Sequence, residues 1–355
     1  MKTPINFDVH FFLTTYCNAF CQHCLMSAGP HQPKNFMNID DVLFYLNEFD
    51  QDSNFNRAVG FNGGEVMTAY KHQSPDYIPT IIQECVNKSY KIDLRTNSLW
   101  TEDNTINSII WNSLDNIDFS KYTNKIKFSL SIDKFHNNES ANAKLISRIC
   151  NSDLCNHFEF DAFLIPDNPD DDTAPDEVIY SRFSSLLRSL RANGIKFSDI
   201  DLDDIPTRYN FGLYLNNVPF FIETHNFGQW GRAREFGIGT PENEYEHILA
   251  QYNIIQHKPF DLDVNNCVKS QSGFVHIIFT PENNGTADFI VPVEKATDGV
   301  PYKTGTKCKP WSTLYPEIVK NLQTRFDALK KQYQDITPEM VQLPSILKQL
   351  TPHSK

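Results

Sequence analysis

Short strand-like segments alternate with longer helical segments from about residue 10 to residue 206. The strand-like segments are rich in β-branched and aromatic residues, whereas the segments between them repeat their apolar residues at helical spacing. This alternation is typical of βα units around a parallel sheet and predicts an α/β fold. The predicted strands lie at 10–16, 57–64, 91–97, 125–133, 157–166 and 197–206.

Five helices are predicted between these strands. The first contains the apolar residues from Ile39 to Phe49 and follows Asn38, a residue type that caps helix N-termini. The last ends before Gly194, as glycine often follows a helix. Six strands and five helices fall short of the eight βα units of a closed barrel, so we expect a partial (β/α)6 TIM-like barrel that is open on one side. The other predicted helices lie at 74–89, 101–114 and 140–151.

The pattern changes after about residue 207. Residues 211–226 look like a strand, and residues 273–292 predict a β-hairpin around the Asn284-Gly285 turn. Residues 314–334 are helical in pattern. We therefore expect two domains, the barrel over 8–206 and a separate antiparallel unit with terminal helices over 207–355.

Three of the eight cysteines, Cys17, Cys21 and Cys24, directly follow the first predicted strand. Thiolates at spacings of four and three can face one point when they lie on a loop, which suits a soft metal or an iron–sulfur cluster. Zinc is the competing metal, but it needs a fourth ligand, and His23 is poorly placed to join its neighbour Cys24. Three cysteines would leave one iron of a four-iron cluster free to bind another molecule.

Polar residues follow three further strands. Gly63, Gly64 and Glu65 end the second strand, Thr96, Asn97 and Ser98 end the third, and Ser129, Ser131 and Asp133 end the fourth. Barrel enzymes place their sites at the carboxyl ends of parallel strands, so these residues are expected near the cysteines.

The order strand then Cys-x3-Cys-x2-Cys, with the aromatic Phe20 beside Cys21, resembles the radical S-adenosylmethionine (radical SAM) superfamily. The resemblance implies that Cys17, Cys21 and Cys24 hold one 4Fe-4S cluster, whose unique iron chelates the amino and carboxylate groups of SAM. The reduced cluster of that family cleaves SAM to methionine and a 5′-deoxyadenosyl radical, which abstracts hydrogen from the substrate.

The strand-end residues extend this resemblance over roughly residues 11–206. Residues 63–65 are similar to the family's Gly-Gly-Glu motif, which contacts the SAM amino group. Residues 96–98 resemble its Thr-Asn-Gly segment with Ser98 in place of glycine, and residues 129–133 resemble its Ser-x-Asp element near the SAM ribose and carboxylate. These residues and Phe20 are therefore the expected SAM-binding residues.

The segment "GQWGRAREFG" (228–237) resembles the Gly-Arg-Ala segment of members with a SPASM or twitch extension, which favours Arg232 as structural or SAM-adjacent. Relatives hold an auxiliary cluster on cysteines before and after a hairpin. Here Cys267 precedes the predicted hairpin, but only Cys308 follows, well beyond it. We therefore expect a SPASM-like fold without an auxiliary cluster.

Cys267 and Cys308 then have two interpretations. They are buried inert thiols, or one of them returns a hydrogen atom to a substrate radical, as radical epimerases resembling this family require. The other three cysteines, Cys85, Cys150 and Cys155, lie in or beside predicted helices and are expected in the core.

Charge and hydropathy limit the partners and the compartment. Lysine and arginine number 32 against 44 acidic residues, a net charge of −12, and no basic run marks a nucleic-acid surface. The chain shows no signal peptide and no membrane span, so we expect a cytoplasmic protein without nucleic-acid or membrane partners. Cysteines in that compartment favour metal ligation or thiol chemistry over disulfides.

The resemblance implies a low-potential electron donor, flavodoxin or ferredoxin. Its SPASM-type part favours modification of a ribosomally made precursor peptide by crosslinking or epimerisation. About ten residues precede the first predicted strand, so no N-terminal leader-binding domain is expected. The alternatives are a radical transformation of a small molecule and, in another class, a non-catalytic metal-binding scaffold with a degenerate SAM fold.

Overall fold

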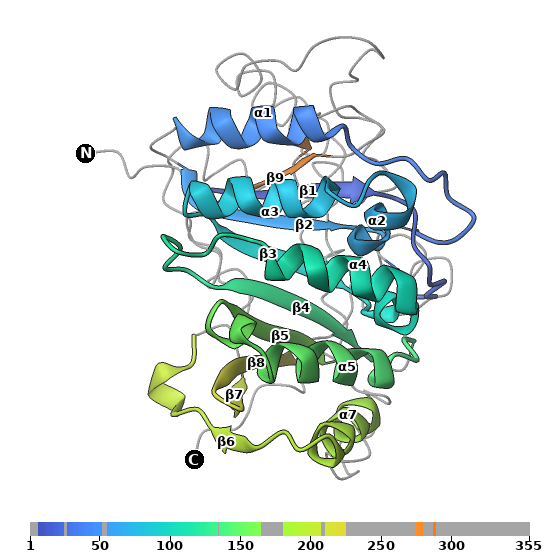
Figure 1. Ribbon diagram of the computed structural model, residues 1–355, viewed down its shortest axis with the longest axis vertical. Coiled ribbons are helices and arrows are strands. Elements are labelled where there is room, and N and C mark those ends of the chain that lie inside the picture. Colours follow the sequence, from blue (N-terminus) through green and yellow to red (C-terminus); the bar gives the residue numbers. More distant parts are fainter. Residues whose placement is uncertain are drawn as a thin grey trace, which may run out of the picture.

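A single ten-stranded sheet runs through the described part of the chain, in the order β10-β9-β1-β2-β3-β4-β5-β8-β7-β6 (Figure 1). The computed structural model describes residues 6–24, 27–51, 55–133, 135–164, 180–206, 210–224, 274–279 and 287–288. The strands are β1 (Asn6–Thr14), β2 (Phe55–Gly63), β3 (Lys91–Thr96), β4 (Ile126–Ile132), β5 (Phe158–Leu164), β6 (Phe197–Asp199), β7 (Phe211–Leu215), β8 (Val218–Thr224), β9 (Phe274–Phe279) and β10 (Ala287–Asp288).

Helices lie between the strands where the spacing of apolar residues predicted them. Asn38 caps the first of them, because its side chain accepts a hydrogen bond from the backbone N–H of Asp40 at 3.0 Å. Gly194 follows the last with φ +78°, the left-handed conformation that favours glycine. The α-helices are α1 (Ile39–Asp50), α2 (Ala69–His72), α3 (Tyr77–Asn87), α4 (Asn104–Asp115), α5 (Glu139–Cys150) and α7 (Ser181–Ala192), and the 3₁₀ helices are η1 (Val66–Thr68), η2 (Leu99–Glu102), η3 (Asp153–Asn156) and η4 (Leu202–Asp204).

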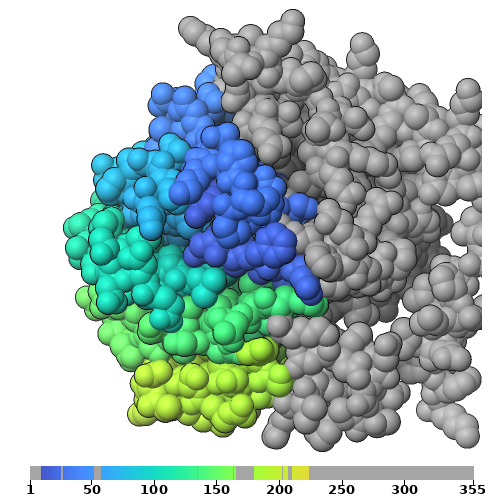
Figure 2. Space-filling view, turned by 90° about the vertical axis from the view of Figure 1, so that its right-hand side faces the viewer, coloured from blue at the N-terminus to red at the C-terminus, as the bar shows by residue number. Residues whose placement is uncertain are grey.

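Seven neighbouring strands of the sheet run parallel, with β9 paired in parallel to β1 at one end of the series. Strands β1 to β5 pair in chain order, and β8 pairs in parallel with β5. The prediction of an α/β fold is confirmed, and within the described residues the sheet has two ends, at β10 and β6. Figure 2 shows the same progression on the surface, from blue N-terminal residues to yellow-green residues near 200 at the far end of the described body.

The sixth parallel strand is not the predicted segment 197–206. Within that segment only β6 is a strand, and it pairs antiparallel with β7 at the end of the sheet. The residues in and directly after β6 are rich in aspartate and mostly exposed. Val218, Phe220 and Ile222 of β8, in contrast, are fully buried. Burial of apolar side chains therefore selects β8 for the interior position.

Residues 211–224 consequently belong to the same sheet rather than to a separate unit. Strands β7 and β8 form a hairpin whose turn residues, Asn216 and Asn217, have φ of 47° and 72°, as asparagine tolerates in a tight two-residue turn. The prediction of a second domain over 207–355 is not tested for most of its length, which lies outside the described residues.

The structure contains two paired strands of the hairpin predicted at 273–292. Strand β9 pairs antiparallel with β10, and its other edge pairs in parallel with β1, so it extends the sheet beyond β1. The turn at Asn284-Gly285 and the predicted helix at 314–334 lie outside the described residues. None of the helices in the described ranges has the length and hydropathy needed to cross a membrane.

The two faces of the parallel strands differ in chemistry. Helices α3, α4 and α5 cover one face (Figure 1), and buried apolar side chains such as Phe11, Phe61 and Phe128 pack beneath the helical layer. The residues that alternate with them on the opposite face are largely polar. We call this the polar face, and it comprises His10, Asn62, Asp93, Arg95, Lys127, Ser129 and Asp161. A parallel sheet buried on both sides is apolar on both, so the polar face is suited to polar ligands.

Candidate functional site

The loop after β1 carries the three motif cysteines, and we call residues 15–24 the cysteine loop. Cys21 is buried, and Cys17 and Cys24 are half-buried. Two of the three sulfurs accept hydrogen bonds from nitrogen donors. Asn97 Nδ2 and the Ala19 N–H donate to Cys17 Sγ at 3.5 and 3.4 Å, and the Ala28 N–H donates to Cys24 Sγ at 3.3 Å. Cys21 contributes to the raised pKa of His136, so these two side chains lie near each other. This donor set suits thiolates.

The electrostatics of Cys17 show that the cysteines lie near one another. Burial, and next the negative charge of Glu65, raise the pKa of the Cys17 thiol far above its ordinary value, and Cys21 and Cys24 add to this shift. Without a cation the thiol therefore keeps its proton. A bound metal ion must displace that proton, and its positive charge makes the displacement favourable.

The predicted Gly-Gly-Glu segment crosses directly against the cysteine loop. The Gly64 N–H donates to Thr14 O at 2.6 Å, and the Glu65 N–H donates to Tyr16 O at 2.9 Å. A Cβ atom at Gly64 would lie 1.9 Å from Tyr16 O, which is far inside van der Waals contact. Gly63 has φ +113°, the region where glycine is favoured. These glycines let two backbones meet.

Alanine at Gly64 is expected to destabilise the protein by about 2–3 kcal/mol, because backbone atoms must move to admit the methyl group. Urea unfolding of Gly64→Ala measures this cost. The matched control is Gly194→Ala, whose Cβ would meet no atom within 4 Å and whose cost is that of its positive φ alone, about 1 kcal/mol. Equal losses in the two variants would contradict the close approach at Gly64.

The carboxylate of Glu65 connects the second and third strand ends. It is buried and accepts hydrogen bonds from Asn97 N at 2.7 Å, Thr96 Oγ1 at 3.0 Å and Met67 N at 3.1 Å. Burial raises the pKa of Glu65 from 4.5 to about 7, although these hydrogen bonds favour the ionised form. An ammonium group placed beside Glu65 would favour the charged carboxylate.

The raised pKa of Glu65 predicts a pH dependence of stability. The contribution of the Glu65 carboxyl group to the free energy of unfolding is fully present below pH 4.5. It is lost as the pH rises toward about 7, because the folded protein disfavours the ionised group. The loss amounts to about 3 kcal/mol. We expect Glu65→Gln to flatten the decline in the free energy of unfolding over this interval.

The control for this prediction is Glu102→Gln. Glu102 is an exposed residue paired with Lys144 on the surface, so its variant should retain the wild-type decline. Chemical unfolding at a series of pH values measures both curves. A Glu65→Gln curve parallel to that of the wild type would contradict the raised pKa.

The predicted segment 96–98 also contacts the cysteine loop. Asn97 Nδ2 donates to Asn18 Oδ1 at 2.9 Å, in addition to its contact with Cys17. Ser98 is fully buried and has φ +61°. The serine therefore adopts the left-handed conformation in which a glycine would be free of strain.

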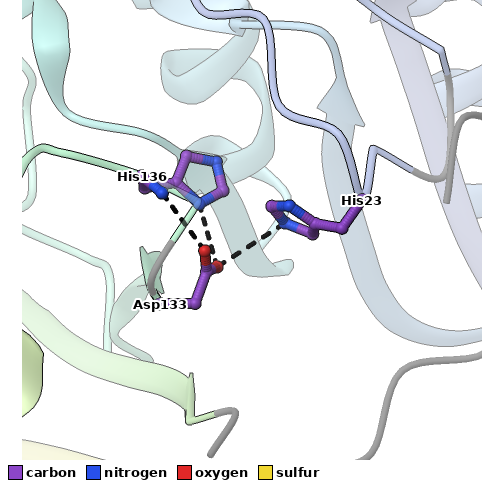
Figure 3. Close-up of side chains that lie close together, drawn as sticks. All are labelled: His23, Asp133 and His136. Carbon is purple, nitrogen blue, oxygen red and sulfur yellow. Dashed lines mark hydrogen bonds and ion pairs between the residues drawn. The ribbon is translucent and has the colours of Figure 1, made fainter. Parts of the chain in front are cut away.

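Asp133, after β4, lies between two histidines (Figure 3). Its Oδ2 is 2.9 Å from His136 Nδ1 and 3.6 Å from His23 Nε2. Burial works against the ionised carboxylate, but His136 and His23 hold its pKa below the usual range. Burial likewise opposes the charged form of His136, yet Asp133 and then Cys21 raise its pKa to about 10. The ligand atoms of these three residues lie within 4.8 Å of one another, close enough to hold a metal ion.

The remaining predicted residues are spread more widely. Ser129 donates to Asp93 on the polar face, Ser131 is half-buried, and Phe20 is 57% exposed beside His31. Arg232, Cys267 and Cys308 lie outside the described residues. The roles of all the predicted site residues stay predictions. The core placement of the other described cysteines is confirmed, since Cys85 and Cys150 are buried in the core and Cys155 packs against it.

Sequence reasoning missed two residues that join the strand ends. Asn138 is buried, and its Nδ2 donates to Asn97 O at 2.6 Å and to Ser131 O at 3.0 Å. His136 contacts Asp133 and lies near Cys21. Their only signal in the sequence is a run of polar residues directly after a strand end that already carries a candidate aspartate.

No protein-family model and no curated protein matches the sequence. Among solved structures, the chain is similar to Streptococcus suis SuiB bound to the precursor peptide SuiA, at 11% identity and a TM-score of 0.48, over 92% of this chain and 67% of that one. Streptococcus suis SuiB is another match, at 11% identity and a TM-score of 0.43, over 89% and 65% of the two chains. The chain thus spans about two thirds of the length of SuiB. At this level of similarity the function has to be argued from the site residues themselves.

Proposed function

We propose that this protein is a radical SAM enzyme that holds one 4Fe-4S cluster on Cys17, Cys21 and Cys24. The cysteine loop carries the proposal, because its three neighbouring sulfurs lie at the carboxyl end of a parallel strand and two of them, those of Cys17 and Cys24, accept from nitrogen donors. Such donors offset the negative charge of a thiolate-bound cluster. When bound, the cluster supplies the electron that cleaves SAM to methionine and a 5′-deoxyadenosyl radical.

The protein's own groups have binding and positioning roles in this proposal. Glu65 accepts from the SAM ammonium group, because it is a buried carboxylate already oriented by Thr96 and Asn97. Asn97 fixes Cys17 and the neighbouring Asn18. The polar face offers hydrogen-bonding groups to a substrate, and the surrounding fold shields the radical from water.

The proposed substrate is a ribosomally made peptide, which is crosslinked or epimerised. The support is the resemblance of residues 228–237 to the SPASM-type segment, and these residues lie outside the described ranges. Flavodoxin or ferredoxin is the proposed electron donor. A small-molecule substrate is the alternative within the same class.

The decisive experiment is an assay for SAM cleavage. The protein is reconstituted with iron and sulfide without oxygen and reduced with dithionite, and 5′-deoxyadenosine is then measured by mass spectrometry. We expect product from SAM, with more in the presence of a short peptide encoded beside the gene. A crosslink would lower the mass of that peptide, whereas an epimerisation would leave it unchanged. A full cluster that forms no 5′-deoxyadenosine with any such peptide would contradict the proposal.

A metal-binding scaffold is the second candidate. It is favoured by the group of His23, Asp133 and His136, two imidazoles and a carboxylate close enough to share a cation beside the cysteine loop. Metal analysis of the purified protein separates the two functions. Zinc without iron, together with no 5′-deoxyadenosine, would support the scaffold.

A further inference from the structure

Tyr16, the residue directly before Cys17, has an aromatic ring that contacts the side chains of His72 and Lys34. The His72 ring approaches it edge-on at 4.8 Å between centroids, and Lys34 Nζ lies 5.4 Å from the Tyr16 centroid. Tyr16 and His72 are half-buried, whereas Lys34 is exposed. An ammonium group near an aromatic face is attracted by the ring. The chain thus places a positive charge beside the start of the cysteine motif.

Two backbone bridges hold the segment around Lys34 against the cysteine loop. Tyr16 pairs with Gly29, and Thr14 pairs with Phe36. Lys34 lies between Gly29 and Phe36 in the sequence. The position of Lys34 next to Tyr16 is therefore determined by backbone contacts on either side of it, and does not depend on the weak attraction between lysine and ring alone.

Lys71, the neighbour of His72 in α2, adds a second exposed lysine. Burial, and next the charges of Lys34 and Lys71, lower the pKa of His72, as expected when both lysines lie near its ring. Neither lysine forms an ion pair with an acid among the described residues. We call Tyr16, Lys34, Lys71 and His72 the basic patch.

The charge of the basic patch is opposite to that of the whole chain, which carries a net charge of −12. Exposed lysines without acidic partners attract a negatively charged protein and speed its encounter with the surface around them. Protein pairs that meet only to transfer an electron use the smallest interfaces, so a few side chains are enough to guide them. The patch therefore has the charge and the size of a transient docking site.

We propose that the basic patch is the docking site of an acidic electron-carrier protein. This inference rests on the proposed function, which consumes one electron for each SAM cleaved. In the docked pair the reduced carrier loses one electron and a cluster on the cysteine loop gains it, and no bond is formed or broken. Tyr16 joins the patch to the proposed cluster ligands, because its peptide bond leads directly to Cys17.

The first test is binding, measured by isothermal titration calorimetry with an acidic flavodoxin and an acidic ferredoxin as probes. Lys34→Glu with Lys71→Glu reverses both charges, so we expect the Kd of the carrier to rise about tenfold or more and to depend less on salt. The matched control is Lys91→Glu with Lys121→Glu. Both control lysines are exposed, at the start of β3 and before β4, where the amino ends of the strands lie away from the cysteine loop.

The second test compares 5′-deoxyadenosine formation with two kinds of reductant. With a reduced carrier, the Lys34 and Lys71 double variant should show a raised KM for that carrier. With dithionite, a small reductant that needs no docking site, its rate should equal that of the wild type.

Two results would overturn the inference while leaving the proposed function intact. One is equal carrier affinity in the double variant and its control, and the other is a wild type that cleaves SAM with dithionite but binds neither carrier. A wild-type protein with a full cluster that cleaves no SAM with any reductant would overturn both.

Discussion

Replacing Cys17, Cys21 and Cys24 together by alanine is expected to abolish iron–sulfur binding and 5′-deoxyadenosine formation. All three proposed ligands are removed, and an alanine methyl group cannot bind iron. The fold should persist, because the parallel strands and their helices pack around a core to which these side chains contribute little. Iron and sulfide per chain, product by mass spectrometry and circular dichroism measure the three outcomes.

The matched control replaces two cysteines away from the cysteine loop, Cys150 and Cys155. Both lie at the end of α5 or just beyond it, in or against the core. This double variant loses thiols without losing the proposed ligands, so it should bind a full cluster and form product. Retention of a wild-type cluster by the triple variant would show that other residues hold the iron.

The sequence predicted the first five βα units well because hydrophobic periodicity reports which side chains face the helical layer. In β4, for example, Phe128 and Leu130 are buried against that layer, while Lys127 lies on the polar face. The prediction of the sixth strand was wrong because it relied on the same periodicity. The spacing of 197–206 resembles a strand, but Val218, Phe220 and Ile222 of β8 bury more apolar surface than β6 does, and periodicity alone does not weigh that difference.

The candidate site was predictable where topology alone determines position. Carboxyl ends of neighbouring parallel strands meet at one edge, so Glu65, Thr96 and Asn97 come together there. The partners of Asp133 were not predictable in this way. They depend on the conformation of the turn after β4, which brings His136 back onto Asp133 and toward Cys21. Side-chain contacts that arise from turn geometry leave little trace in spacing.

The polar face contains a lysine held between two acids. Lys127 Nζ lies 3.2 Å from Asp93 Oδ2 and 3.0 Å from Asp161 Oδ2, on three neighbouring strands. Asp161 is 1% exposed and the Lys127 side chain 12%. Burial alone would raise the pKa of Asp93, but Lys127 and then Arg95 hold it below its usual range. The lysine therefore favours the ionised form of Asp93 and lies within ion-pair distance of the buried Asp161 as well.

Lys127→Met is expected to destabilise the protein by about 3–5 kcal/mol, because it removes the cation that Asp93 and Asp161 share. Urea unfolding at neutral pH measures the loss. Lys144→Met is the matched control, because Lys144 pairs with Glu102 on the surface and should cost less than about 1 kcal/mol. Adding Asp161→Asn to Lys127→Met removes one uncompensated charge and should recover part of the stability.

The pH dependence of the same variant identifies the cause. Without Lys127 the pKa of Asp93 rises, so protonation at low pH relieves the repulsion and the deficit relative to the wild type shrinks as the pH falls. Loss of packing around the lysine stem would instead give a deficit that does not change with pH. Unfolding curves of the wild type and of Lys127→Met at several pH values therefore separate electrostatics from packing as the reason why the polar face needs a lysine at its centre.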